Sequence, residues 1–131
     1  MPALNALYRD YRDRVEFLVV YIHEAHPIDA WQLDSNIEDD VLVVTTRTAD
    51  DRHRVAGVCV TTLGIELPAV VDEPDDRVER AYTAWPDRLY VVDKTGAIAY
   101  KSAAGPFGFR PSEVGATLES LSALPPPIET A

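Results

Sequence analysis

The chain has 131 residues, of which 47% are hydrophobic and 26% are charged, a composition typical of one globular domain. Its formal charge of -10 excludes binding that is driven by the phosphates of nucleic acids or by anionic lipid. The longest apolar run, residues 15–22, is too short to cross a bilayer, and the N-terminus lacks the features of a signal peptide, so we expect a cytoplasmic protein. Cys59 is the single cysteine, which excludes an internal disulfide, a CxxC pair and a cysteine-rich zinc site.

The first third of the chain predicts a helix, a buried strand and a long loop. Residues 4–11 carry apolar side chains on one helix face. Residues 15–22 are almost continuously apolar, which predicts a strand near the centre of a parallel sheet, covered on both faces. Residues 23–40 have no sustained period and carry many polar and acidic side chains, so we expect a long loop. Residues 41–44 are apolar and form either a short strand or a buried part of this loop.

Two helices and a strand are expected in the middle of the chain. Thr48 and Asp51 resemble a capping box that opens a helix ended by Gly64. Residues 67–72 read as a buried strand, and Pro74 suits the first turn of the next helix. The apolar face expected for the first of these helices consists of Val55, Val58, Cys59, Thr62 and Leu63.

The last third predicts a hairpin and a final helix. Residues 89–92 and 97–100 are apolar and flank a short turn, which is a hairpin signal. A loop rich in glycine and proline leads to a helix that begins near Pro111. We therefore expect one domain over residues 1–124, followed by a C-terminal tail over residues 125–131.

The order of these elements predicts an α/β fold with parallel crossovers first and an antiparallel hairpin last. This is the order of a thioredoxin-like fold, a central mixed sheet flanked by helices, without its opening strand. A sheet that lacks its central strand exposes strand edges and apolar side chains. We therefore expect low stability or homodimer formation for residues 1–131 alone.

Three sequence blocks together span nearly the whole chain. Residues 7–31 contain LYRDYRDR followed by FLVVYIHEAHPIDAW, residues 86–92 read PDRLYVV, and residues 100–114 contain YK, GPFGF and PSEV. In this order they resemble the iodothyronine deiodinase family, thioredoxin-fold reductive dehalogenases that use a selenocysteine or a cysteine. Ala30 stands where the family usually has glycine.

The resemblance implies the residues of a catalytic site. Tyr21, Glu24 and His26 match family positions thought to relay a proton to the leaving carbon in reductive dehalogenation. An imidazole supported by a carboxylate and a phenol suits that work near neutral pH. Asp87 matches an acidic position beside the active site. No bound cofactor or metal is expected, and a thiol is the expected electron donor.

The same resemblance implies the substrate-binding residues Trp31, Pro86 and Arg88. Pro86 lies where thioredoxin folds commonly carry a cis-proline, and the Trp31 ring either stacks on an aromatic substrate or anchors its loop. Thr46 and Ala104 stand where the family has a histidine and an arginine that contact thyroid hormone. Losing a cation that binds a carboxylate weakens that contact, so we expect a small halogenated aromatic, disulfide or peroxide substrate instead.

The nucleophile implied by the family has no match in this sequence. In the family it ends the opening strand, just before the segment that matches residue 1 onward. Cys59 lies among apolar residues of a helix face, where packing is the better explanation than catalysis. We therefore expect a thiol- or selenol-dependent oxidoreductase that is inactive without that residue. The alternative is a non-enzymatic thioredoxin-fold module that binds or scaffolds a partner, for example by strand pairing.

The polar residues that follow the first strand have two other interpretations. His23, Glu24, His26 and Asp29 could bind zinc or iron, since imidazole and carboxylate suit both metals. Their spacing resembles the proton relay more closely, and no second pair of ligands stands elsewhere in the sequence. Without the resemblance, they would be ordinary polar groups at the end of a strand.

Overall fold

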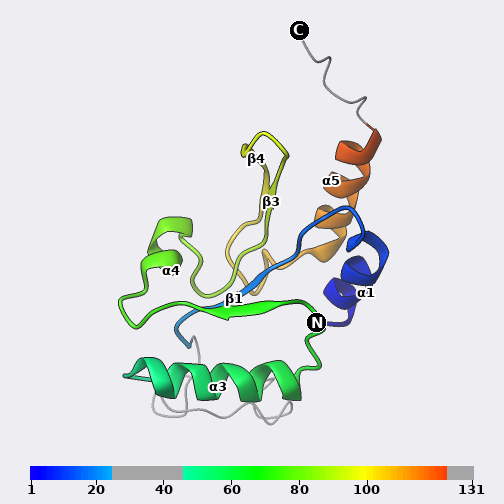
Figure 1. The fold of residues 1–131 in the computed structure, drawn as a ribbon. Helices are drawn as coiled ribbons and strands as arrows, with labels where there is room; N and C mark the ends of the chain where they lie inside the picture. The colour runs from blue at the N-terminus through cyan, green and yellow to red at the C-terminus, as the bar shows by residue number, and fades with distance from the viewer. Residues whose placement is uncertain (25–45, 124–131) are drawn as a thin grey trace, which may run out of the picture.

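Helices and short strands alternate along the residues that this computed structural model describes, 1–24 and 46–123 (Figure 1). The result is a mixed α/β arrangement, and the order of its elements is the one expected from the sequence. In chain order the elements are α1 (Pro2–Tyr11), β1 (Val19–Tyr21), α3 (Ala49–Thr62), β2 (Ala69–Val71), α4 (Arg77–Tyr82), β3 (Tyr90–Val92), β4 (Ile98–Lys101) and α5 (Pro111–Ala123).

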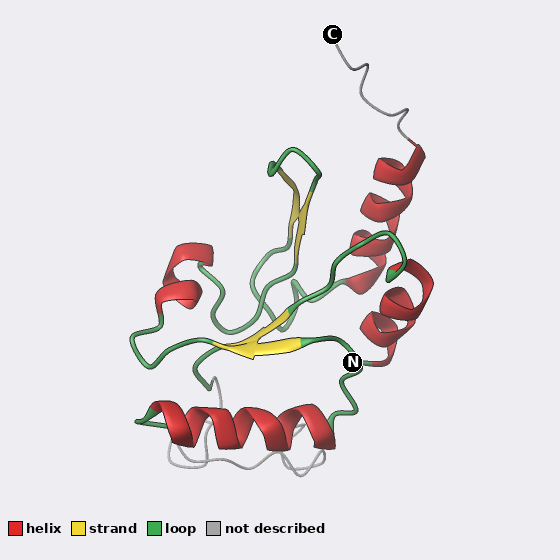
Figure 2. Ribbon diagram, in the orientation of Figure 1, coloured by secondary structure: helices red, strands yellow, loops and turns green. Residues whose placement is uncertain are grey.

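The strands form two separate pairs (Figure 2). β1 and β2 are parallel, with Val19 opposite Ala69, whereas β3 and β4 form an antiparallel hairpin with Tyr90 opposite Lys101. Within residues 1–24 and 46–123 no strand joins the two pairs. β1 and β3 therefore each present one edge whose backbone groups have no strand partner in this part of the chain.

The helices cover the two strand pairs separately. α5 packs on β3, β4 and α1, and α3 packs on β2 (Figure 1). The best-defined core is the cluster of Val91, Val114 and Leu118, between the hairpin and α5. No side chain in the described ranges is completely buried, so the hydrophobic core that these residues form is thin. The partly buried residues around the cluster are Leu7, Tyr11, Val15, Phe17, Leu89, Tyr100 and Leu121.

The strands of the parallel pair are shorter and more exposed than predicted. The strand expected over residues 15–22 forms only at Val19–Tyr21, and Leu18 is 61% exposed. The strand expected to be buried over residues 67–72 forms at Ala69–Val71, where Val70 is 46% exposed. Burial on both faces needs further strands and helices beside and above the pair, and the described elements do not supply them.

The helix that follows Thr48 begins and ends as predicted. The Thr48 hydroxyl accepts a hydrogen bond from the Asp51 N–H at 3.1 Å, and Gly64 adopts a positive φ of 59° after the last turn. Its buried face is shifted from the predicted one, because Val58 is 54% exposed. The buried residues of α3 are Arg52, Val55, Ala56 and Cys59.

Asp72 sets the start of α4. This residue is 3% exposed, and its carboxylate accepts hydrogen bonds from the backbone N–H groups of Val78 at 3.1 Å and Glu79 at 2.9 Å. These N–H groups belong to the first turn, where they have no partner inside the helix. The helix therefore begins at Arg77 and not at Pro74 as the sequence suggested.

Replacing Asp72 with alanine should lower the free energy of unfolding by about 1–2 kcal/mol, because two N–H groups lose their acceptor. Urea denaturation measures this loss. The matched control is Asp75→Ala, because Asp75 is exposed and pairs only with the neighbouring Arg77. Its effect should stay within about 0.5 kcal/mol. Equal losses in the two variants would contradict the role given to Asp72.

The predicted hairpin and the predicted final helix are confirmed, whereas other predicted features fall on residues that the structure does not describe. The structure describes His23, Glu24 and residues 46–123, but not the rest of the loop, the apolar run expected before Thr46 or the residues after 123. His26, Asp29, Ala30, Trp31 and the C-terminal tail belong to that part. No helix in the described ranges is both long enough and apolar enough to cross a bilayer.

Candidate active site

Two of the predicted relay residues meet at the end of β1. Tyr21 is the last residue of this strand, and its hydroxyl donates to Oε1 of Glu24 at 3.2 Å. Glu24 is 8% exposed. Thr46 binds it from the other side, with its hydroxyl oxygen 3.0 Å from both carboxylate oxygens and its backbone N–H donating to Oε2 at 3.3 Å. The arrangement fixes the Glu24 carboxylate beside the Tyr21 phenol, as a proton relay requires.

A buried arginine extends this polar group into α3. Nε of Arg52 donates to the Thr46 hydroxyl at 3.4 Å, and Nη1 donates to the Glu73 carbonyl at 2.8 Å and to Oδ1 of Asp76 at 2.7 Å. Arg52 is 3% exposed. A buried guanidinium has to be paired, and here the pairing links the Glu24 carboxylate to the start of α4.

Arg52 was not predicted as a site residue, although its position in the sequence indicates a buried charge. Arg52 stands at i-3 and i-4 relative to Val55 and Ala56, so all three share one helix face. A charged residue on an apolar helix face is rare unless it has a partner. That position would have indicated a buried ion pair.

Burial keeps the Tyr21 hydroxyl and the Cys59 thiol protonated at neutral pH. Burial, followed by the charges of Cys59 and Glu24, raises the pKa of Tyr21 above its ordinary range. Burial also raises the pKa of the Cys59 thiol; hydrogen bonding with Tyr21 opposes this rise and the Glu24 charge adds to it. Tyr21 therefore acts as a neutral hydrogen-bond donor. The Cys59 thiol lies close to it but is not activated as a nucleophile.

Asp87 lies in the segment that leads into β3, and its Oδ1 is buried with no hydrogen-bond partner in the described part of the chain. The backbone carbonyl of Asp87 accepts from the Gly105 N–H at 3.0 Å. A Cβ atom on Gly105 would lie 1.9 Å from Oδ2 of Asp87, so only glycine lets this carboxyl pack against the loop. Burial raises the pKa of Asp87, which favours a protonated carboxyl compared with an exposed aspartate.

The raised pKa makes Asp87 a source of pH-dependent stability. A carboxyl whose pKa is higher in the folded state stabilises the fold below the unfolded-state pKa, and this contribution is lost as the pH rises through the folded-state value. We expect Asp87→Asn to be more stable than the parent protein at pH 7.5, with the advantage shrinking toward pH 4. Urea midpoints at the two pH values measure it, and an advantage that grows toward pH 4 would contradict this sign.

Arg88 binds backbone carbonyls. Its Nε donates to the Thr83 carbonyl, and its Nη1 donates to the Ser102 carbonyl at 2.9 Å, which ties the end of α4 to the residue after β4. The Trp85-Pro86 peptide bond is cis. Arg88 also borders an open pocket of about 540 Å³. This pocket is lined by Glu79, Arg80, Thr83, Trp85 and Arg88.

The two positions that differ from the family's hormone contacts lie in different surroundings. Thr46 is buried against Glu24. Ala104 lines a pocket of about 270 Å³ together with Phe107 and Arg110. The Arg110 guanidinium lies 3.2 Å from the Glu113 carboxylate.

Comparison with known proteins identifies the family. The sequence profile described as "Iodothyronine deiodinase" matches residues 1–122 of this chain. The chain is 33% identical to type I iodothyronine deiodinase of Xenopus laevis over 88% of this chain and 43% of that protein. It is 36% identical to type II iodothyronine deiodinase of Petromyzon marinus, over 89% and 40%, and 34% identical to thyroxine 5-deiodinase of Bos taurus, over 91% and 38%. The chain thus spans about two fifths of the length of these relatives, and it belongs to the iodothyronine deiodinase family.

Proposed function

We propose that this chain supplies the scaffold and the proton relay of a deiodinase-type reductase with a thioredoxin-like fold. The order of the elements and the family membership support this proposal. The thioredoxin-like domain extends over residues 1–124, and Tyr21, Glu24 and His26 form the relay. Asp87 is the second acidic group of the site, and Trp31, Pro86 and Arg88 bind the substrate.

The observation that carries the proposal is the position of Tyr21 and Glu24 at the end of β1, one edge of which has no strand partner among residues 1–24 and 46–123. Parallel strands end at the same side of a sheet. A strand that pairs with β1 in parallel would therefore end beside Tyr21 and Glu24. If a cysteine or selenocysteine follows that strand, its chalcogen lies within reach of the relay.

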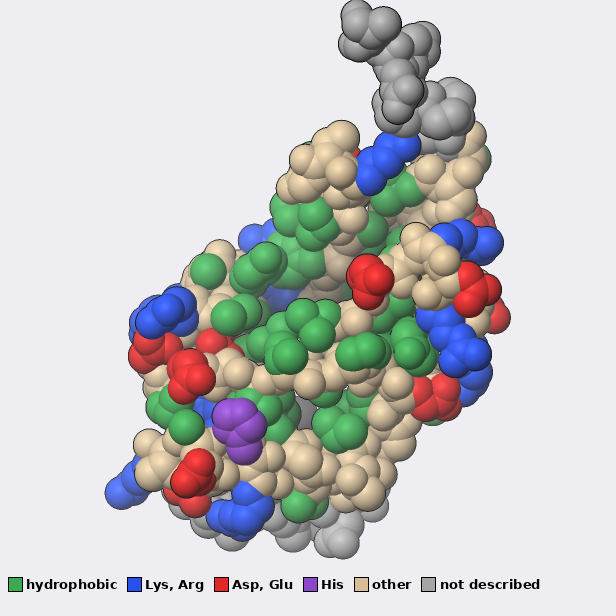
Figure 3. All heavy atoms as spheres, in the orientation of Figure 1, with side chains coloured by type: hydrophobic (Ala, Val, Ile, Leu, Met, Phe, Trp, Pro, Cys, Tyr) green, Lys and Arg blue, Asp and Glu red, His purple; other side chains and the backbone are tan. Residues whose placement is uncertain are grey.

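The thin core of the described residues also favours a further strand between β1 and β3. Hydrophobic side chains gather across the face that Figure 3 shows, over the region where the hairpin and the parallel pair lie. Leu18, Val92 and Ile98 are each at least half exposed. A strand placed between β1 and β3 would cover apolar surface of this kind, which is worth about 25 cal/mol per Å².

The chemistry that follows is a two-step reduction. The thiolate or selenolate attacks the halogen of an aryl halide, the carbon–halogen bond breaks, and the carbon takes a proton through the relay. Two molecules of a thiol then reduce the enzyme–halogen bond: halide and a disulfide are released, the thiolate or selenolate is regenerated, and the two thiol protons go to solvent and the relay. Glu24 and Tyr21 hold the proton path for the first step, and no metal or bound cofactor takes part. Without the nucleophile, residues 1–131 have no such activity.

The test adds the strand to the full chain. A β-strand that ends in cysteine is fused before α1, and halide release from an iodinated phenol is measured with dithiothreitol as the electron donor. We expect thiol-dependent release, none from the chain without the strand, and none when the added cysteine is serine. Tyr21→Phe should lower the rate about tenfold or more, whereas Tyr100→Phe, whose hydroxyl binds the exposed Glu113, should not. Absence of release from a fusion whose β1 and β3 amides are protected from exchange would overturn the proposal.

A second candidate function rests on the same open edges. A non-enzymatic module would use them to pair with a strand of a partner protein or of a second copy. This candidate predicts that a strand lacking the cysteine binds as well as one that carries it, with no halide release in either case.

A further inference from the structure

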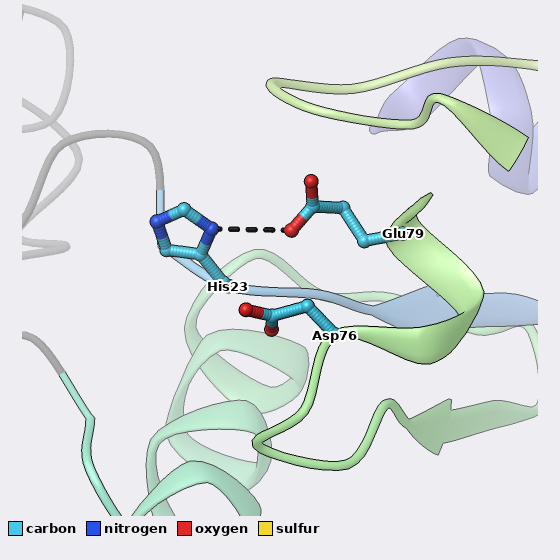
Figure 4. A group of neighbouring side chains, drawn as sticks. All are labelled: His23, Asp76 and Glu79. Atoms are coloured by element: carbon cyan, nitrogen blue, oxygen red, sulfur yellow. Dashed lines mark hydrogen bonds and ion pairs between the residues drawn. The ribbon is translucent and has the colours of Figure 1, made fainter. Parts of the chain in front are cut away.

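Three metal-ligating side chains converge between the end of β1 and the start of α4 (Figure 4). His23 follows β1, Asp76 precedes the first residue of α4, and Glu79 lies in the first turn of that helix. One ligand atom of each residue lies within 4.8 Å of the ligand atoms of the other two. None of the three belongs to the proposed relay.

Buried groups hold the two carboxylates in position. Asp72 accepts from the Glu79 backbone N–H at 2.9 Å, which fixes the start of the helix, and Arg52 binds Oδ1 of Asp76 at 2.7 Å. Both Asp72 and Arg52 are 3% exposed. Partners of this kind, one layer behind the ligands, orient metal sites and are as important as the ligands themselves.

The imidazole is also oriented. The ring of His23 stacks on that of Trp85, with the ring centroids 6.2 Å apart and the planes at 20°. Its Nδ1 lies 3.2 Å from Oε2 of Glu79. Two ligands of one zinc ion are separated by roughly 3.2–3.4 Å when each bond is about 2.0–2.1 Å long. The pair is therefore already spaced as ligands of one ion.

The charge balance also favours a cation. Asp76 pairs with the Arg52 guanidinium and Glu79 pairs with His23, so these four side chains together keep a net negative charge when the imidazole is neutral, in a chain whose formal charge is -10. Of the two carboxylate oxygens of Asp76, Arg52 binds Oδ1, and no hydrogen bond to Oδ2 comes from the described part of the chain, which leaves Oδ2 for an ion. The imidazole favours a transition metal over Mg²⁺ or Ca²⁺, both of which prefer oxygen ligands.

We propose that His23, Asp76 and Glu79 form a binding site for a divalent transition metal ion, with Zn²⁺ as the ion that fits this ligand set best. Three protein ligands leave a coordination position open. Glu79 also lines the pocket of about 540 Å³, as does Trp85. The open position therefore faces solvent and can hold water or an anionic oxygen of a ligand. This site goes beyond the proposed reductase function, which uses no metal.

The test is isothermal titration calorimetry of the chelator-treated full chain with Zn²⁺ alone. We expect one equivalent to bind. His23→Ala and Glu79→Gln should each weaken binding about tenfold or more. The matched control is His53→Ala, because His53 is an exposed histidine on α3 whose Nδ1 lies 2.8 Å from the Ala49 carbonyl. This variant should bind like the parent protein.

Circular dichroism of each variant separates loss of the site from loss of the fold. The proposal holds if the folded His23→Ala and Glu79→Gln variants lose the stoichiometric binding that His53→Ala retains. It is overturned if the parent protein binds no stoichiometric Zn²⁺. Full binding by His23→Ala, or a loss of binding in His53→Ala equal to that in His23→Ala, would overturn it as well.

Discussion

Replacing Arg52 with leucine should lower the free energy of unfolding by about 3–5 kcal/mol, the cost of removing one partner from a buried charged network. The guanidinium is the donor for the Thr46 hydroxyl, the Glu73 carbonyl and the Asp76 carboxylate. Leucine fills part of the space but leaves these acceptors without a donor. Guanidinium chloride denaturation, followed by circular dichroism, measures the change.

The control for this experiment is Arg54→Leu on the same helix. Arg54 is exposed, and its ion pair with Asp51 spans 3.4 Å at the surface. Its removal should change the free energy of unfolding by less than about 0.5 kcal/mol. An Arg52→Leu protein that unfolds at the same denaturant midpoint as the Arg54→Leu protein would contradict the structural role of the buried network.

Replacing Glu24 with glutamine should lower the turnover of the strand-completed protein by about 10²–10⁴-fold, the usual contribution of general acid–base catalysis. Glutamine keeps the size of the side chain and one of the two oxygens that accept from Tyr21 and Thr46, but it does not exchange protons. The rate of halide release measures the effect.

The control for Glu24 is Glu66→Gln. Glu66 is an exposed carboxylate that pairs with Arg9 on α1, away from Tyr21. We expect it to keep the parent rate. If Glu24→Gln lost stability and turnover in equal measure, Glu24 would be a structural residue and not part of a relay.

Local signals in the sequence predicted three features of the fold. The Thr48 cap, the glycine after α3 and the turn of the β3–β4 hairpin depend on neighbouring residues only, and all were predicted. The extent of burial of β1 and β2 was not predicted, because it depends on which other elements lie beside and above these two strands. An apolar run such as residues 15–22 indicates a buried strand, but only the assembled sheet decides how much of it forms.

In the candidate site, too, contacts between neighbours in the sequence could be predicted, whereas contacts between distant segments could not. The contact between Tyr21 and Glu24 could be anticipated, because the two residues lie close in the sequence and match the family's motif. The position of Arg52 on an apolar helix face indicates that it is buried with a partner, but no local pattern reveals that this partner includes the Asp72 carbonyl, 20 residues away. The grouping of His23 with Asp76 and Glu79 also joins distant segments, so no local pattern predicts it. The sequence had placed His23 with other neighbours in a possible metal cluster.

The most direct test of the central claim is the intact mass of the protein from its native cells after labelling with iodoacetamide under native conditions. The account predicts a labelled cysteine or selenocysteine other than Cys59, because Cys59 is buried and its thiol is not activated. The labelled residue should lie in a strand-forming segment before α1. A mass of 14.5 kDa with no label, or with label on Cys59 alone, would contradict the account, because no reactive nucleophile would then stand beside Tyr21 and Glu24.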